Sequence, residues 1–501
     1  MNPRLSLTYG LRYTVNIPYS AIWRNMDVFD PAYCDPAKAV KQDPKTGYVI
    51  PGSGDAYNGI VIPGDGVPSF VGGRVFAFAT DQYKYLFRGV PAHYSNIHYN
   101  QFQPRLGVAY SLNSKTVVRS GLGRFFTRLG VSDSVFLGGN PPFQPIVSVS
   151  NGRVDNPGGG SQNQFPLTVT TQSKDFKNPE SWAWNFTVER ELPLKSTVSV
   201  AYVGRRGLHM QQERDINQLP AGTLRGPNAI TGVNTDHLRP YKGYAVIRQT
   251  DNVASSIYHS FQLNWTRRVS AGLSFGVAYT LAKSMDNGSA QRDILPNSND
   301  RNAMWGPSDF DQRHTAVLYS IYELPLFRGQ KSLLAKLAGG WQLSPVVQFQ
   351  TGTPSSVGLG NDYAGVGTLG SMSGLGQLWD VNGDPEIIHD FAVNNADPHY
   401  WFQTKKSDGS NIFTAPKDGT FSTGKNRNLI YAPGLQNWNI GLFKKFQINE
   451  RAGFQFRAEA YNFINHPNWG GPDRNPTSST FGKVTSKSSE RNLQLSLRFY
   501  F

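Results

Sequence analysis

The chain has 501 residues, of which 39% are hydrophobic and 13% aromatic, and its formal net charge at pH 7 is +14. No run of 18 apolar residues occurs, which excludes a transmembrane helix. The only cysteine is Cys34, so an intrachain disulfide is excluded as well. Helical periodicity is limited to a turn or two at 333–337, unlike the pattern of a soluble α/β enzyme of this length.

The dominant pattern along the chain is alternation of apolar with polar residues, the period of a β-strand with one dry and one wet face. In the first such row, Leu5, Leu7 and Tyr9 alternate with Ser6 and Thr8. The rows lie at 4–15, 103–112, 182–189, 198–202, 261–265, 273–281, 341–349, 438–442, 454–461 and 493–501. The polar face of every strand explains the low mean hydropathy of −0.42. The 13% of aromatic residues fits the aromatic bands that β-barrels place at the two membrane interfaces. The sequence therefore predicts an all-β, antiparallel fold.

The linkers between these rows alternate between long and short. Working back from the last residue, the long linkers are 464–490, 351–435, 284–312, 206–258 and 129–180. The short ones are 448–452, 269–272, 192–196 and 113–115, and 325–340 is a turn of moderate length on the same side. Outer-membrane barrels have long extracellular loops and short periplasmic turns, whereas a soluble sandwich has no reason to sort its loops. We therefore expect a transmembrane β-barrel with about twelve strands present. Because the strand at 4–15 must run outward and the strand at 103–112 inward, we expect 18–101 to be one extracellular connection, with a strand-like piece at 74–88.

The carboxyl-terminal strand has an entirely apolar face made of Leu493, Leu495, Leu497, Phe499 and Phe501. It resembles the closing strand of bacterial outer-membrane barrels, which the barrel-assembly machinery recognises. We expect these five residues to face lipid and to serve as the outer-membrane assembly signal. Periodicity alone leaves a soluble barrel open, and the sorted loops favour the membrane.

No catalytic, cofactor or metal site can be assembled from the sequence. Cys34 has no positioned base, and the nine histidines show no ligand spacing. The segments 286–289 and 380–384 resemble pieces of calcium loops without the full spacing, so Asx-Gly turns explain them better. The aromatic and Asn-rich segments 400–402 and 425–428 are interpreted as ordinary surface loops. The chain is not expected to be an enzyme.

The net positive charge is spread over strands and loops, with no basic helix or compact basic cluster. It favours a cation-lined lumen and contact with outer-membrane lipids and anionic lipopolysaccharide over nucleic-acid binding.

Particular segments resemble the TonB-dependent outer-membrane receptors of the Oar-like type, which carry a carboxypeptidase-regulatory-like domain. The resembling stretches are 2–13, 102–107, 203–207, 216–220, 258–260, 279–284, 306–311, 340–343 and 463–467. The resemblance covers nearly the whole chain as the carboxyl-terminal part of such a barrel. It implies a barrel of about 22 strands with a plugged lumen, located in the outer membrane of a Gram-negative-type bacterium. It also implies TonB-driven uptake, or surface export, of a bulky substrate.

The chain departs from this family upstream of its first strand. Residues 1–501 read as barrel throughout, and no signal peptide, plug, TonB box or regulatory-like domain precedes Arg4. The expected interpretation is a fragment of a transporter that contacts TonB only through a plug missing from this chain. The alternative is a self-contained twelve-stranded outer-membrane channel or surface-binding protein. Neither interpretation identifies the substrate.

Overall fold

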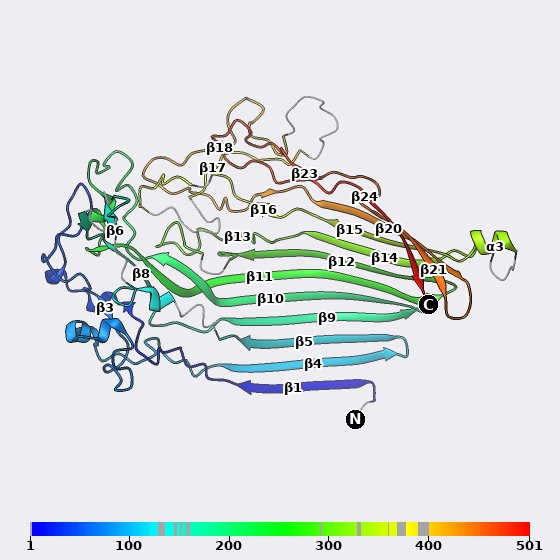
Figure 1. Ribbon diagram of the computed structural model, residues 1–501, viewed down its shortest axis with the longest axis horizontal. Coiled ribbons are helices and arrows are strands. Elements are labelled where there is room, and N and C mark those ends of the chain that lie inside the picture. The colour runs from blue at the N-terminus through cyan, green and yellow to red at the C-terminus, as the bar shows by residue number, and fades with distance from the viewer. Residues whose placement is uncertain are drawn as a thin grey trace.

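The computed structural model describes residues 3–128, 136–144, 148–150, 153–156, 161–290, 293–327, 332–358, 360–367, 377–388 and 400–501. Its main feature is one antiparallel sheet in which twelve strands follow one another in chain order (Figure 1). These strands are β1 (Leu5–Tyr13), β4 (Phe102–Asn113), β5 (Thr116–Phe126), β9 (Glu180–Leu192), β10 (Ser196–Asp215), β11 (Tyr244–Ser270), β12 (Leu273–Asp286), β14 (His314–Glu323), β15 (Trp341–Gln350), β20 (Leu435–Gln447), β21 (Gly453–Tyr461) and β24 (Asn492–Tyr500). The predicted all-β class and the sorted loops are confirmed.

Short turns join the strands at the end of the sheet where both chain termini lie (Figure 1). The β11–β12 hairpin is closed by Ala271 and Gly272, both with positive φ, 51° and 78°. Two positive φ values match the twist of the flanking strands and make a tight hairpin. The connection between β14 and β15 is longer and holds the short helix α3 (Leu333–Ala338). This end corresponds to the periplasmic side of an outer-membrane barrel.

Long connections gather at the opposite end of the sheet and over part of it. We call the described residues of 14–101, 127–179, 216–243, 287–313, 351–434 and 462–491 the outer crown. Its strands are β2 (Val28–Phe29), β3 (Ile60–Val61), β6 (Ser148–Ser150), β7 (Ser161–Asn163), β8 (Leu167–Gln172), β13 (Gly306–Pro307), β16 (Pro354–Ser355), β17 (Asp380–Val381), β18 (Phe413–Thr414), β19 (Ile430–Tyr431), β22 (Asn468–Trp469) and β23 (Lys487–Ser488). Its helical turns are η1 (Pro31–Tyr33), η2 (Pro36–Lys38), η3 (Phe76–Phe78), η4 (Asp81–Leu86), η5 (Phe136–Gly139) and α2 (Thr235–Leu238).

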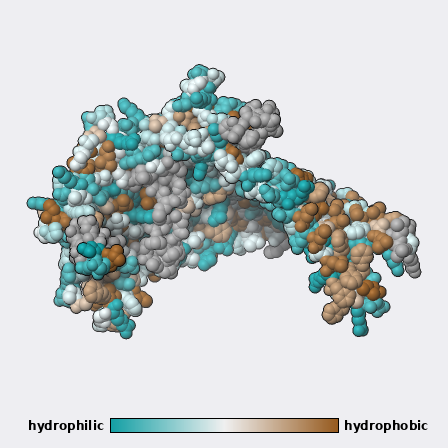
Figure 2. Space-filling model, turned by 45° about the horizontal axis from the view of Figure 1, so that its top comes forward, coloured by the Kyte–Doolittle hydropathy of each residue, from teal (hydrophilic) through white to brown (hydrophobic). Residues whose placement is uncertain are grey.

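Burial in this molecule is inverted relative to a soluble protein. The buried apolar clusters lie mainly in the crown, one around Phe29, Ile60 and Tyr244 and another around Phe402 and Ile430. The strands instead expose their apolar rows, and hydrophobic side chains gather on the surface where β20, β21 and β24 lie (Figure 2). Lipid covers such a surface at little cost, because its side chains are apolar and the backbone groups of neighbouring strands pair in the ladders. In the described part of the chain, no helix is long and apolar enough to cross a membrane.

Two sequence-based boundaries are wrong. Residues 74–88 form the helical turns η3 and η4 instead of a strand, with Thr80 capping η4 by accepting a hydrogen bond from the Gln82 N–H. The loop predicted at 206–258 is much shorter, because β10 runs to Asp215 and β11 begins at Tyr244. These strand extensions are covered by the crown, so neither face meets lipid and the alternating pattern disappears.

Candidate ligand-binding site in the outer crown

A polar pocket of about 470 Å³ lies where three long crown connections meet. It is lined by Asp309 from the connection after β12, by Ser355, Ser356 and Asn428 from the connection after β15, and by Arg474 from the connection after β21. Thr353, Pro354, Ala432, Gly471 and Pro472 complete the lining. Hydroxyl, amide, carboxylate and guanidinium groups from distant parts of the chain therefore face one cavity. It lies at the outer end of the twelve-stranded sheet, which we call the wall.

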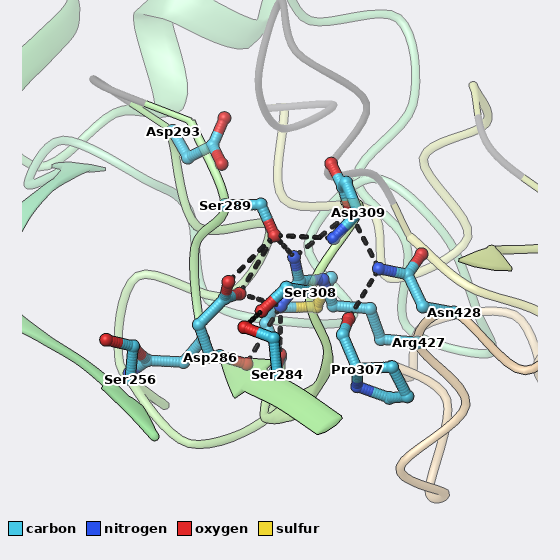
Figure 3. A network of polar contacts seen from close by, with 12 residues as sticks. Ser256, Ser284, Asp286, Ser289, Asp293, Pro307, Ser308, Asp309, Arg427 and Asn428 are labelled. Carbon is cyan, nitrogen blue, oxygen red and sulfur yellow. Dashed lines mark hydrogen bonds and ion pairs between the residues drawn. The ribbon is translucent and has the colours of Figure 1, made fainter. Parts of the chain in front are cut away.

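Arg427 directly precedes the lining residue Asn428 and is fully buried. Figure 3 shows the polar network around it. Its Nη1 donates to Asp286 Oδ1 at 2.7 Å, to the Asp286 carbonyl oxygen at 2.9 Å and to the Met304 carbonyl oxygen at 3.1 Å. Its Nη2 donates to Ser289 Oγ and, at 3.1 Å, to Asp309 Oδ1. A buried guanidinium is stabilised by hydrogen bonds from its amino groups, and these Nη1 and Nη2 contacts fix the 351–434 connection against the outer end of β12.

Asn428 continues the network from Arg427 toward the pocket. Its Nδ2 donates to Asp309 Oδ1 at 2.6 Å and to the Pro307 carbonyl oxygen at 2.7 Å (Figure 3). Its backbone N–H donates to Ser356 Oγ at 3.0 Å, and its φ of 58° turns the chain so that these bonds form together. Asp309 is thus held by two neighbours while its side chain stays 44% exposed. A carboxylate oriented in this way can accept hydrogen bonds from a polar ligand.

Tyr431 and Asp311 tie the same region to the wall. The Tyr431 hydroxyl donates to Asp311 Oδ2 at 2.6 Å, and the Ser284 N–H of β12 donates to Asp311 Oδ1 at 2.6 Å. Burial, followed by the hydrogen bond to Asp311, raises the pKa of Tyr431. The phenol therefore stays neutral and remains a donor at physiological pH.

The donor and acceptor groups that line the pocket can bind a polar ligand. In the part of the chain that the structure describes, no group of three or more His, Cys, Asp or Glu side chains is placed to hold a metal ion. Cys34 is half-buried in the first long connection, where burial and then Asp35 raise the pKa of its thiol. A raised thiol pKa is the opposite of what a nucleophile requires.

The sequence-predicted residues have mixed outcomes. Leu493, Leu495, Leu497, Phe499 and Phe501 are exposed on β24 and just beyond it, by 74%, 74%, 65%, 49% and 95%. Their role as an assembly signal stays a prediction. In the segment 286–289, Ser289 Oγ donates to both carboxylate oxygens of Asp286, and in the segment 380–384 Asp380 accepts from the Ser422 hydroxyl. The carboxylates of both calcium-like segments thus hold the crown together.

The interpretation of 400–402 and 425–428 as ordinary surface loops is wrong. Trp401 and Phe402 are buried in a crown cluster, and Arg427 is the buried arginine described above. Sequence reasoning missed the pairing of Arg427 with Asp286 because the two residues are 141 positions apart. A usable signal was the motif 306–311, which supplies Asp309 and Asp311 to the same region.

The chain matches one protein family and is similar to several solved structures. Residues 1–494 match the family described as outer membrane beta barrel domain. The solved structures that are similar to the chain include the outer membrane transporter YddB from Escherichia coli (11% identity, TM-score 0.42) and the ferric enterobactin receptor PfeA from Pseudomonas aeruginosa (10%, 0.40). Each likeness covers 81% of this chain and 41% of the other. The siderophore receptor PiuA from Acinetobacter baumannii is also similar (8%, TM-score 0.37), with coverage of 80% and 36%.

The chain thus spans well under half the length of these solved structures. No curated protein matches its sequence. The family match extends over nearly the whole chain, and the exposed apolar strand rows and sorted loops are the features that such a family requires. The chain is therefore an outer-membrane protein and belongs to the outer membrane beta barrel domain family.

Proposed function

We propose that this chain is the carboxyl-terminal barrel region of a TonB-dependent outer-membrane transporter of the Oar-like type, which moves a bulky substrate across the outer membrane. The observation that carries the proposal is the polar pocket, built by three crown connections at the outer end of a membrane-spanning wall. A receptor captures its substrate at that end before transport. The motifs at 102–107, 203–207 and 306–311 supply the resemblance to the Oar-like branch.

The two outermost strands support a larger barrel. Among the described residues, β1 pairs only with β4 and β24 only with β21, so each strand has one edge without a partner. Lipid cannot satisfy the backbone N–H and C=O groups of such an edge. Further strands on these edges would complete a barrel of about 22 strands. TonB would then act through a plug domain outside this chain.

A second candidate function is a self-contained twelve-stranded channel or surface-binding protein. It is favoured by one observation: β1 and β24 run in opposite directions in an even-numbered sheet, as two strands that close an antiparallel barrel must. In that case the lumen would be an open aqueous pore and the crown would carry the binding activity.

Cysteine cross-linking in outer membranes separates the two candidates. In a Cys34→Ser background, Thr8→Cys on β1 is combined with Gln494→Cys or Ser496→Cys on β24, all three on the polar face. The positive control pairs Thr8→Cys with Gly107→Cys, since Thr8 and Gly107 are ladder partners and a Cβ added at Gly107 lies 3.7 Å from the Thr8 Cβ. That separation is suitable for a disulfide.

A larger barrel predicts that the control pair cross-links and both β1–β24 pairs stay reduced. A cross-link between β1 and β24 would overturn the larger barrel and favour the twelve-stranded channel. The variant Asp309→Ala then tests whether the pocket binds the substrate. It removes the exposed carboxylate of the pocket, while Arg427 keeps its bonds to Asp286. A receptor role predicts weaker binding of substrate by an outer membrane that holds the normal amount of protein.

A further inference from the structure

A second and larger cavity, of about 760 Å³, lies at the outer rim of the wall beside the crown. Its wall side is made by Tyr279 in the middle of β12 and by His314, Ala316, Phe349 and Gln436 at the outer ends of β14, β15 and β20. Its crown side is made by Ile387, Trp401, Tyr431 and His466. The volume is within the range of about 300 to 1,000 Å³ that is typical of small-molecule sites.

The ladder register shows on which face of the wall this cavity lies. Tyr279 is opposite Ala316, Ala316 is opposite Phe349, and Phe349 is opposite Gln436. Residues directly opposite in an antiparallel ladder share a face. Tyr279 also shares its face with Val277 and Leu281 of the same strand, because side chains alternate along a strand. That face is the apolar one, so the cavity is continuous with the lipid-facing surface.

The chemistry of the lining is that of an apolar slot with polar groups at its margin. Trp401 is largely buried and its Nε1 donates to the Tyr431 carbonyl oxygen at 2.5 Å, which holds the indole over the cavity. Tyr279 and His314 satisfy each other through a contact of 2.8 Å between the hydroxyl and Nδ1. Ala316 leaves space between these rings.

One charged side chain at the cavity invites an anionic partner. Arg313 lines the cavity, and its guanidinium donates one bond to the Ala282 carbonyl oxygen at 3.3 Å. Hydrogen bonds from a guanidinium to an anionic group are charge-assisted and therefore strong. His466 lines the same cavity.

We propose that this cavity binds one acyl chain of an outer-leaflet lipid, whose anionic head group lies beside Arg313 and His466. The chain enters from the lipid-facing side between Tyr279 and Phe349 and packs under Trp401. Burial of a hydrocarbon chain supplies the affinity, and the guanidinium of Arg313 sets the position of the head group. The bound lipid would join the crown to the membrane at the rim.

The test uses photoactivatable lipid. The full chain is reconstituted in phosphatidylethanolamine and phosphatidylglycerol vesicles that contain a trace of phosphatidylglycerol with a diazirine in its acyl chain. After irradiation, mass spectrometry maps the labelled residues. The proposal predicts preferential labelling of peptides that contain Phe349, Trp401 or His466. Ala316→Trp fills the cavity and should lower that labelling by about tenfold, the factor expected when roughly two methylene groups lose their burial.

The matched control is Ala458→Trp, which adds the same side chain to the same apolar face on β21, opposite Leu442 and Leu495 and outside the cavity. It should leave labelling at the cavity unchanged. Ala316→Leu is a smaller filling variant that should act in the same direction as Ala316→Trp, and heat-modifiable migration on gels verifies that each variant is folded. Uniform labelling along the apolar face, or cavity labelling that folded Ala316→Trp does not reduce, would overturn the proposal.

Discussion

The guanidinium of Arg427 and the carboxylate of Asp286 form a buried ion pair, with Nη1 and Oδ1 separated by 2.7 Å. The pair joins the 351–434 connection to the last residue of β12, across 141 positions of sequence. Arg427→Ala would leave the Asp286 charge buried without its partner, a change that costs about 3 to 5 kcal/mol. We expect the crown residues 377–388 and 400–431 to lose protection in hydrogen exchange, while the strands of the wall stay protected.

The control for this prediction is the exposed ion pair between Arg225 and Asp418, at 2.9 Å, which also joins two crown connections. Exposed pairs contribute about 0 to 1 kcal/mol because water screens them, so Arg225→Ala should have little effect on protection. Equal protection in Arg427→Ala and the parent protein would show that the buried pair does not hold the connection.

Asp27 makes the stability of the folded crown depend on pH. Its side chain is fully buried, and this burial raises the pKa of the carboxyl well above the ordinary value, although a hydrogen bond from Asn140 Nδ2 at 3.0 Å acts in the opposite direction. The folded crown therefore holds the proton more tightly than the unfolded chain. Its stability is greatest below the unfolded pKa and falls as pH rises toward the folded pKa.

Asp27→Asn should remove this dependence, because the amide keeps an acceptor for Asn140 and carries no charge. Each unit of upward pKa shift costs about 1.4 kcal/mol once the carboxyl must ionise, so the variant is expected to be more stable than the parent at pH 8. Hydrogen exchange of residues 26–29 and 137–140, corrected for intrinsic rates, measures the effect at pH 5 and pH 8. A parent protein whose protection does not fall between these pH values would contradict the assignment.

The wall was predictable from sequence because lipid imposes one rule on every strand. Leu495 and Tyr9 must face hydrocarbon and their neighbours must not, so the period of two marks each membrane-crossing segment. The long and short linkers then follow from the two sides of the membrane. Twelve strands and their order could be obtained in this way without any knowledge of the crown.

The crown was not predictable, because it is an ordinary packed core built from distant segments. Phe402 and Ile430 belong to one buried apolar cluster, although the sequence around each of them is that of a polar loop. Arg427 looks like a surface residue until the fold brings Asp286 beside it. Arg74 to Arg88 contains alternating apolar residues that pack around helical turns. Apart from the motif at 306–311, local patterns did not point to these long-range partners.

The β11–β12 turn should be sensitive to a single methyl group. Gly272 has a φ of 78°, where a side chain costs about 1 to 2 kcal/mol. Gly272→Ala is expected to lower the temperature at which the folded, heat-modifiable form disappears. Gly10→Ala is the control, because Gly10 lies in β1, has no positive φ and has no atom within 4 Å of an added Cβ. Equal temperatures for both variants would contradict the positive-φ argument.

Charge on the terminal strand tests which face meets lipid. Leu495 is 74% exposed on β24 opposite Ala458, and a lysine in the middle of the lipid face costs about 2 to 4 kcal/mol. Leu495→Lys and Leu497→Lys should therefore reduce the amount of folded protein in the outer membrane, measured by heat-modifiable migration in membrane fractions. Gln494→Lys is the matched control, since Gln494 lies on the polar face opposite Glu459, where a lysine meets an opposite charge. Assembly of Leu495→Lys at the level of Gln494→Lys would show that this face does not contact lipid, and it would also remove the basis for the assembly signal at Leu493 to Phe501.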